Sequence, residues 1–176
     1  MTLEAFADTI VPGEKRSPDD RAVAGVSAGG GAVAAGAIEL LETPATGIST
    51  ALDDYAEALN RHAREYAAGH GLVLDDGVPP FVALGFDDRT ALARELTSPQ
   101  HPEKELWVLL TLFSNMAFDT AAHLHTTDAL AAGHPGLLAM GFLDPGEDAL
   151  WRFPDFSYGR PLAELHPDTT ATGSPA

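Results

Sequence analysis

Residues 103–132 carry the longest helical pattern in the chain, EKELWVLLTLFSNMAFDTAAHLHTTDALAA. In its first half, apolar residues cover nearly the whole circumference of a helix: Leu106, Trp107, Val108, Leu109, Leu110, Leu112 and Phe113. A helix without a polar face has to be covered by other elements on all sides. We therefore expect helix 103–132 to be the buried centre of the fold, with Gly133 and Pro135 ending it.

Shorter helical patterns, separated by loops, precede this segment. Residues 2–10 predict a short helix that a proline-glycine pair ends. Residues 50–68 form the clearest amphipathic pattern, with apolar side chains along one stripe. A further helix is expected after Asp87 or Asp88, either of which can cap its N-terminus.

The complete pattern is that of a mainly α protein. Residues 72–86 contain two apolar pieces that form either a loop or a small hairpin, and Pro79 and Pro80 weaken the hairpin. We predict an irregular bundle of about five or six helices around the central helix 103–132, with long loops and an extended C-terminal arm. We expect one helical domain over residues 1–153 and the arm over residues 154–176, with a disordered end.

Three consecutive glycines, Gly29, Gly30 and Gly31, lie in an alanine-rich segment. A dinucleotide-binding loop would need a preceding strand and the order G-x-G-x-x-G, and neither is present. The overlapping G-x-S-x-G string of residues 25–29 also lacks the strand that a nucleophilic serine requires. We expect one or two helical segments over residues 21–44. The glycines then mark a break near residue 30 or a place where another backbone comes close.

The chain is strongly acidic, with 26 Asp and Glu against 10 Lys and Arg and a formal net charge of −16. This excess either keeps the protein soluble or forms an acidic docking face, and it makes nucleic acid and anionic membranes unsuitable partners. The absence of cysteine excludes disulfides and thiolate chemistry. No apolar run is long enough to cross a membrane. We expect a cytoplasmic protein, unless an export signal has been trimmed from the chain.

Polar residues interrupt the apolar pattern in the string FSNMAFDTAAHLHTTDAL, residues 113–130. On a helix, which turns about 100° per residue, His123 and His125 would point about 200° apart and could not share a metal ion. A second set of polar side chains would lie on one face within about 80°: Asn115, Asp119, His123 and Thr126. Asp119 and His123 are one turn apart, so the carboxylate can hydrogen bond to the imidazole and prepare it as a general base.

Three interpretations of this polar face remain open. It is a solvent-facing side or ordinary polar network, a buried network at a partner interface, or a catalytic or ligand site. His125, on the same expected face as Trp107, is predicted to lie in the core or at an interface. No motif indicates a metal ion or a cofactor, and the two Glu-x-x-His motifs of a di-iron bundle are absent from the sequence.

The opening LEAFADTIVPG, residues 3–13, resembles the start of the gluconate 2-dehydrogenase subunit 3 family. Members begin with a helix of the type ADTIIPG followed by a polar loop, and AMGFLDPG at residues 139–146 is similar to the family's terminal aromatic-Gly-Pro region. The resemblance implies a small helical accessory subunit of a flavin-dependent dehydrogenase of the glucose-methanol-choline type, often exported with it. The chain departs from the family in its glycine-rich second segment, its acidic excess and its lack of an export signal.

Two functional hypotheses follow. The first is an accessory or chaperone-like subunit, without a cofactor, that binds a flavoprotein through an apolar face and the C-terminal arm. Its expected contact residues are Trp107, His125, Thr126, Phe156 and Tyr158. The alternative is a stand-alone, cofactor-independent enzyme of bacterial secondary metabolism acting on a small-molecule substrate. In it, Asp119 and His123 perform acid-base chemistry and Asn115 orients the substrate.

Overall fold

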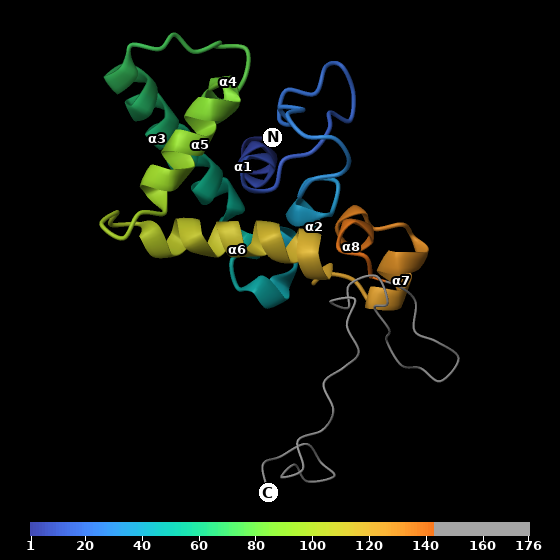
Figure 1. The fold of residues 1–176 in the computed structure, drawn as a ribbon. Helices are drawn as coiled ribbons and strands as arrows, with labels where there is room; N and C mark the ends of the chain where they lie inside the picture. Colours follow the sequence, from blue (N-terminus) through green and yellow to red (C-terminus); the bar gives the residue numbers. More distant parts are fainter. Residues whose placement is uncertain (143–176) are drawn as a thin grey trace, which may run out of the picture.

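The computed structural model describes residues 1–142, which form eight α-helices and two short 3₁₀ helices (Figure 1). The α-helices are α1 (Thr2–Ile10), α2 (Ala37–Glu42), α3 (Leu52–His70), α4 (Pro80–Ala83), α5 (Phe86–Leu96), α6 (Lys104–Thr120), α7 (Thr126–Ala131) and α8 (Pro135–Ala139). The 3₁₀ helices η1 (Pro44–Thr46) and η2 (Ser49–Ala51) precede α3. Residues 1–142 contain no strand, so the mainly α prediction is confirmed.

Some predictions concern residues beyond this range. The C-terminal arm expected over residues 154–176, with Phe156 and Tyr158, lies outside the described residues, and so does the domain boundary at residue 153. Within residues 1–142, no helix is both long enough and apolar enough to cross a membrane.

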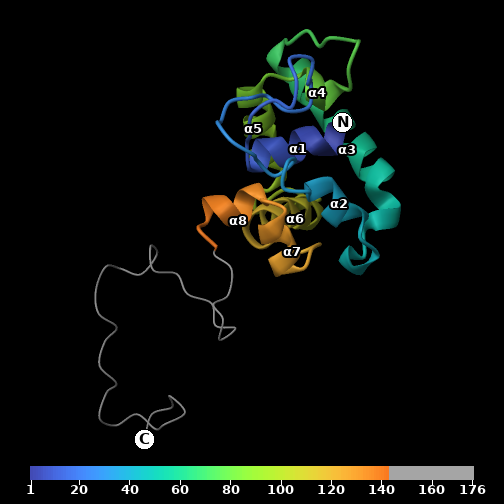
Figure 2. The ribbon, with the colours of Figure 1, turned by 90° about the vertical axis from the view of Figure 1, so that its right-hand side faces the viewer.

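Helix α1 is the most enclosed element of the fold. It contacts α2, α3, α4, α5 and α6, and Figure 2 shows it with α4 and α5 on one side and α2 and α6 on the other. Its Ala5, Phe6 and Ala7 are fully buried. The Phe6 ring lies 6.2 Å from the rings of both Phe81 and Trp107, so α1 joins α4 to α6 in one apolar core.

Helix α6 is central but shorter and less buried than predicted. It contacts α1, α2, α5 and α8, yet Leu112 and Met116 are 52% and 38% exposed. The single helix expected over residues 103–132 is divided, because α6 ends at Thr120 and Ala121 adopts a left-handed conformation with φ 48°.

The break after Thr120 has a tertiary cause. Ala121 is buried against Ala129, Leu130 and Leu137, which α7 and α8 bring back onto the end of α6. At Gly136 of α8 there is no room for a side chain, because a Cβ would collide with the carbonyl oxygen of Phe118. Close packing of α8 on α6 therefore outweighs the helical pattern that continues through residue 132 in the sequence.

The segment of residues 21–44 is mostly not helical, and only α2 lies in it. The other expectation for its glycines, a close approach of another backbone, is confirmed. The amide of Glu14 donates to the carbonyl of Gly29 at 2.8 Å, and the amide of Ala32 donates to the carbonyl of Val11 at 2.9 Å. The G-x-S-x-G string accordingly lies in a loop with no strand before it.

Two buried charges organise this loop. One carboxylate oxygen of Asp8 accepts from the amide of Gly13 at 3.1 Å, and the other accepts from the amide of Ala24 at 2.8 Å. The guanidinium of Arg89 donates to the carbonyl oxygens of Ala22 and Leu84 at 2.8 and 3.0 Å. The loop between α1 and α2 is therefore fixed to both α1 and α5.

The remaining elements agree with the sequence except in two respects. The amphipathic pattern of residues 50–68 becomes α3, and the expected helix becomes α5. The expected cap is wrong, because the N-cap residue is Gly85 and both Asp87 and Asp88 lie within the first turn of α5. The hairpin considered for residues 72–86 does not form, because Pro80 begins α4 instead. Proline is well suited to the first turn of a helix, where its missing amide has no partner to lose.

Replacing Gly31 by alanine should destabilise the protein by about 1–3 kcal/mol, as overpacking a close contact does. The new Cβ would collide with the carbonyl oxygen of Val11 and lie 2.6 Å from the amide nitrogen of Gly13. Gly69→Ala is the matched control, because Gly69 lies within α3 with open space around it. The control should stabilise the protein by up to about 1 kcal/mol. Urea unfolding measures both, and equal effects would contradict the close approach.

Candidate functional site

The polar face predicted for residues 115–126 is split by the end of α6. Asn115 and Asp119 lie on the last two turns of α6, His123 lies in the connection, and Thr126 begins α7. The prediction of one continuous helical face is therefore wrong. The Asn115 side chain donates to the carbonyl of Thr111 at 3.0 Å, so its amide is engaged within its own helix.

Asp119 and His123 do not form the predicted hydrogen bond. Oδ1 of Asp119 and Nδ1 of His123 are both buried, and neither has a hydrogen-bond partner. The His123 ring lies against Gly36, where a Cβ would collide with its Nε2. Burial lowers the pKa of His123, nearby His134 lowers it further, and the charge of Glu39 opposes both effects. The neutral imidazole is the form that a general base needs.

His125 and Trp107 do not share a face. His125 is exposed, and its Nδ1 lies 2.7 Å from Oγ1 of Thr127, so it does not lie in the core. Its other expected place, at an interface, stays a prediction. Trp107 is fully buried, which also removes its side chain from any directly exposed contact surface. Thr126 is half-buried.

His134, which no sequence pattern distinguishes, is a buried structural histidine. It caps α8, where its Nδ1 accepts from the amide of Leu137 at 3.2 Å. Its Nε2 therefore carries the proton and donates to the carbonyl of Ala35 at 3.0 Å. This side chain joins α8 to the turn before α2.

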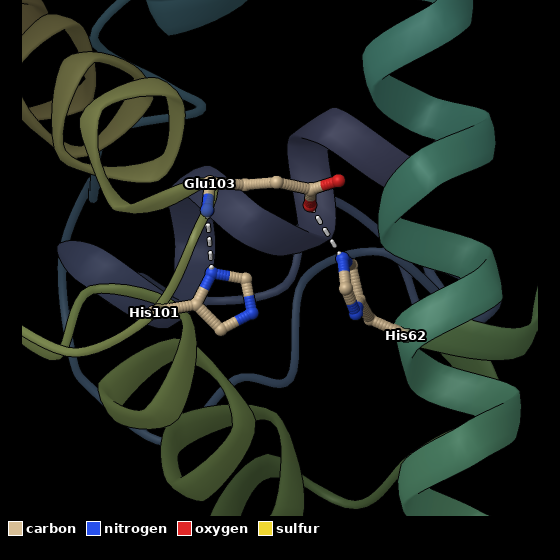
Figure 3. A group of neighbouring side chains, drawn as sticks. All are labelled: His62, His101 and Glu103. Carbon is tan, nitrogen blue, oxygen red and sulfur yellow. Dashed lines mark hydrogen bonds and ion pairs between the residues drawn. The ribbon is translucent and has the colours of Figure 1, made fainter.

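A second cluster, which we call the α3–α6 cluster, consists of His62, His101 and Glu103 (Figure 3). His62 extends from α3 toward the turn between α5 and α6, which supplies the other two residues. Nε2 of His62 lies 2.7 Å from Oε2 of Glu103, and the amide of Glu103 donates to Nδ1 of His101 at 3.1 Å. The two imidazole rings meet edge to face at 5.4 Å.

The turn that carries His101 and Glu103 follows from its local sequence. The amide of His101 donates to the carbonyl of Ser98, and the amide of Lys104 donates to the carbonyl of His101, both at 3.1 Å. Pro99 and Pro102 flank His101 and keep the chain from continuing α5. Glu103 thereby becomes the N-cap residue of α6 and faces the middle of α3.

The surroundings of the α3–α6 cluster are partly charged and partly apolar. The hydrogen bond with His62 lowers the pKa of the Glu103 carboxyl, burial opposes that change, and Arg61 lowers the pKa further from 3.3 Å. Beside His62 and His101 lies a pocket of about 230 Å³, whose wall includes Glu65 and His70. The cluster thus combines imidazole and carboxylate groups with space for a small ligand.

Sequence reasoning missed this cluster. His62 reads as a solvated residue of an amphipathic helix, whereas its side chain is only 16% exposed. His101 and Glu103 lie in a proline-rich connection with no metal-binding or catalytic spacing. The one available signal is the string Pro99-Gln-His-Pro-Glu103, which places a histidine and a glutamate in a rigid turn between two helices.

The described residues thus define a small all-helical protein with a histidine-carboxylate cluster at one end of α6 and unpartnered Asp119 and His123 at the other. The chain belongs to a protein family described as a family of unknown function, DUF5987, whose match extends over residues 1–176. No curated protein and no solved structure matches the chain.

An NMR titration of the imidazole carbons should give His123 a pKa below 6.5, because the charged ring is poorly solvated where it lies. The stability that depends on a neutral His123 should be fully present above the pKa of the unfolded chain. It should be lost as the pH falls through the lower pKa of the folded protein. Glu39→Gln removes the one opposing charge and should lower this pKa further. A pKa above 6.5 would contradict the burial of this ring, and a rise in the Glu39→Gln variant would contradict the effect assigned to the Glu39 charge.

Proposed function

We propose that the chain is an accessory, chaperone-like small subunit that binds a flavin-dependent oxidoreductase of the glucose-methanol-choline type in the cytoplasm. The resemblance of residues 3–13 to the gluconate 2-dehydrogenase subunit 3 family supports the choice of partner. These residues form α1 and the turn after it, around which the other helices pack. The resemblance therefore falls on the element that the core is built around.

The observation that carries the proposal is an apolar groove beside α6, which we call the α6 groove. It has a volume of about 350 Å³ and is lined by residues of α1, α5 and α6 together with Thr97. They are Thr9, Ile10, Thr90, Ala93, Arg94, Thr97, Val108, Thr111 and Leu112. Leu112 and Met116, one helical turn apart, continue the apolar surface at 52% and 38% exposure. Neighbouring exposed apolar side chains of this kind are typical of a protein-protein contact.

The charge of the chain and of the groove lining indicates which side chains a partner surface should carry. The groove lining carries a single charged residue, Arg94, while the whole chain has a formal net charge of −16. A partner with an apolar projection for the groove and basic residues away from Arg94 would match both features. A flavoprotein subunit with such a face is the occupant that we propose.

One observation favours a second function, an enzyme that acts through Asp119 and His123. Buried polar atoms in folded proteins almost always have hydrogen-bond partners, and exceptions occur where a ligand or a reaction uses them. Oδ1 of Asp119 and Nδ1 of His123 are two such exceptions near the same end of α6. In this alternative a small-molecule substrate supplies the missing partners, and the neutral His123 accepts its proton.

Co-expression of the full chain with a glucose-methanol-choline-type flavoprotein from the same genome tests the subunit proposal. The chain should elute with the flavin absorbance in size-exclusion chromatography. Leu112→Asp should weaken this association at least about tenfold, since it places a charge in the apolar groove. Val73→Asp is the control, because Val73 is 98% exposed in the loop after α3. Elution of the chain alone beside the flavoprotein would refute the proposal.

The enzyme alternative is tested by incubating a bacterial metabolite extract with the chain and comparing the products by mass spectrometry. The wild type and the His125→Ala control should convert the same compound, since His125 is exposed and bonded to Thr127. Asp119→Asn with His123→Ala should reduce that conversion at least about 100-fold, as loss of general acid-base catalysis does. Conversion unchanged in the double variant, or absent from the wild type, would eliminate this alternative.

A further inference from the structure

The α3–α6 cluster has the composition of a metal-ligand set. His62, His101 and Glu103 each offer one ligand atom, and these atoms lie within 4.8 Å of one another. Two imidazoles and one carboxylate are the protein ligands of many zinc sites that keep a fourth position for water. The same set binds iron(II) with open positions. Figure 3 shows the His62 side chain approaching Glu103 from α3, with His101 on the opposite side of the gap.

A carboxylate lies near each ring nitrogen of His62. Its Nε2 faces Glu103 at 2.7 Å, while its Nδ1 lies 3.8 Å from a carboxylate oxygen of Glu65. A histidine that ligates a metal through one nitrogen usually directs its other N–H toward a carboxylate or carbonyl, which fixes the ring. Glu65 is the nearest carboxylate for that role if Nε2 is the ligand atom, and it would have to move closer than 3.8 Å to accept the hydrogen bond.

A second, independent observation comes from Trp107. Its indole Nε1 is buried and has no hydrogen-bond partner among the described residues. Trp107 lies one helical turn after Glu103, and its backbone amide donates to the Glu103 carbonyl at 3.4 Å. Trp107 also packs against His62, with the rings edge to face at 5.7 Å. A buried, unpartnered indole N–H therefore lies beside the cluster, on a ring that contacts His62.

Space for the remaining ligands is present. The pocket of about 230 Å³ borders both His62 and His101, so water molecules can complete the coordination of an ion held there. The residues that could be mistaken for ligands lie farther out on the same wall. His70, for example, stacks on Tyr66 at 4.1 Å, and its Nδ1 hydrogen bonds to the Tyr66 carbonyl.

Metal binding must displace two hydrogen bonds. The ion replaces the proton shared between His62 and Glu103, so binding releases a proton when that proton is present. His101 accepts the Glu103 amide at Nδ1, so its neutral ring carries a proton on Nε2. His101 ligates after its imidazole turns about the Cβ–Cγ bond or after Nδ1 releases that amide. These requirements predict an affinity that depends on all three side chains.

We propose that His62, His101 and Glu103 form a binding site for one divalent transition-metal ion, with Zn²⁺ as its expected occupant. The soft-to-borderline imidazole ligands select Zn²⁺, Co²⁺ or Fe²⁺ over Mg²⁺ and Ca²⁺, which prefer oxygen-only sites. The site joins the middle of α3 to the turn that ends at Glu103, the N-cap residue of α6. It is independent of the subunit proposal, because it requires no second protein.

The test uses the untagged full chain, treated with a chelator and then titrated with Co²⁺ in excess Mg²⁺, which occupies the acidic surface. One Co²⁺ per chain should bind and give visible absorption bands of a nitrogen-containing, four- or five-coordinate site. Zn²⁺ should displace it stoichiometrically. His62→Gln, His101→Gln and Glu103→Gln should each weaken binding at least about tenfold. His70→Gln is the matched control from the same pocket wall and should bind as the wild type does.

A second measurement covers variants that fail to fold. Zn²⁺ added to the wild type should shift the NMR signals of the His62 and His101 rings and leave those of His125 and His134 unchanged. Absence of one-to-one Co²⁺ binding by the wild type would overturn the proposal. Equal binding by a folded His62→Gln/His101→Gln variant would also overturn it. Either result would make the α3–α6 cluster a hydrogen-bonded junction between helices.

Discussion

Two buried charges, Asp8 of α1 and Arg89 of α5, fix the loop between α1 and α2, on which the position of the later helices depends. Asp8 is 1% exposed and Arg89 is 4% exposed. Asp8 accepts from the amide of Ala24, and Arg89 donates to the carbonyl of Ala22 in the same loop. Burial lowers the pKa of Arg89, and the negative charge of Asp8 opposes that change. A buried charge is costly without polar partners, and backbone groups supply such partners to both Asp8 and Arg89.

The loop fixed by these charges determines where the C-terminal helices attach. It ends in the turn before α2, where Ala35 accepts from His134 and Gly36 lies against the His123 ring. His134 caps α8, and α8 packs on α6 so closely that Gly136 has no room for a side chain. The position of His123 is therefore a consequence of the loop and of α8. It does not follow from the helical phase of the sequence around it.

This dependence explains how much the sequence could predict. The helix at residues 2–10 was predicted with its observed bounds, and residues 50–68 appear as α3 shifted by two residues, because apolar spacing and Pro-Gly stops act locally. The end of α6 at Thr120 has no local signal, since Ala121 is a good helix former. The helix ends there because residues later in the chain pack against Ala121. Because α6 ends at Thr120, the residues of the predicted polar face no longer lie on one helix: Asn115, Asp119, His123 and Thr126. The mainly α class was predictable because it depends on many local patterns at once.

The α3–α6 cluster illustrates the same limit at the level of chemistry. His62 and His101 are 39 residues apart, and their proximity depends on how α5 returns the chain to α3.

Helix α6 separates the α3–α6 cluster, the α6 groove and the Asp119–His123 pair from one another. Glu103 precedes its first turn, Leu112 lies at its middle and Asp119 lies near its last residue. At 1.5 Å per residue, Glu103 and Asp119 are about 24 Å apart along the axis. Groups so distant, with no shared partner, act on stability and binding almost independently. A metal site at one end of α6, a docking groove at its middle and an acid-base pair at the other end are therefore separable properties. Evidence for or against one of them leaves the other two to be decided by their own contacts.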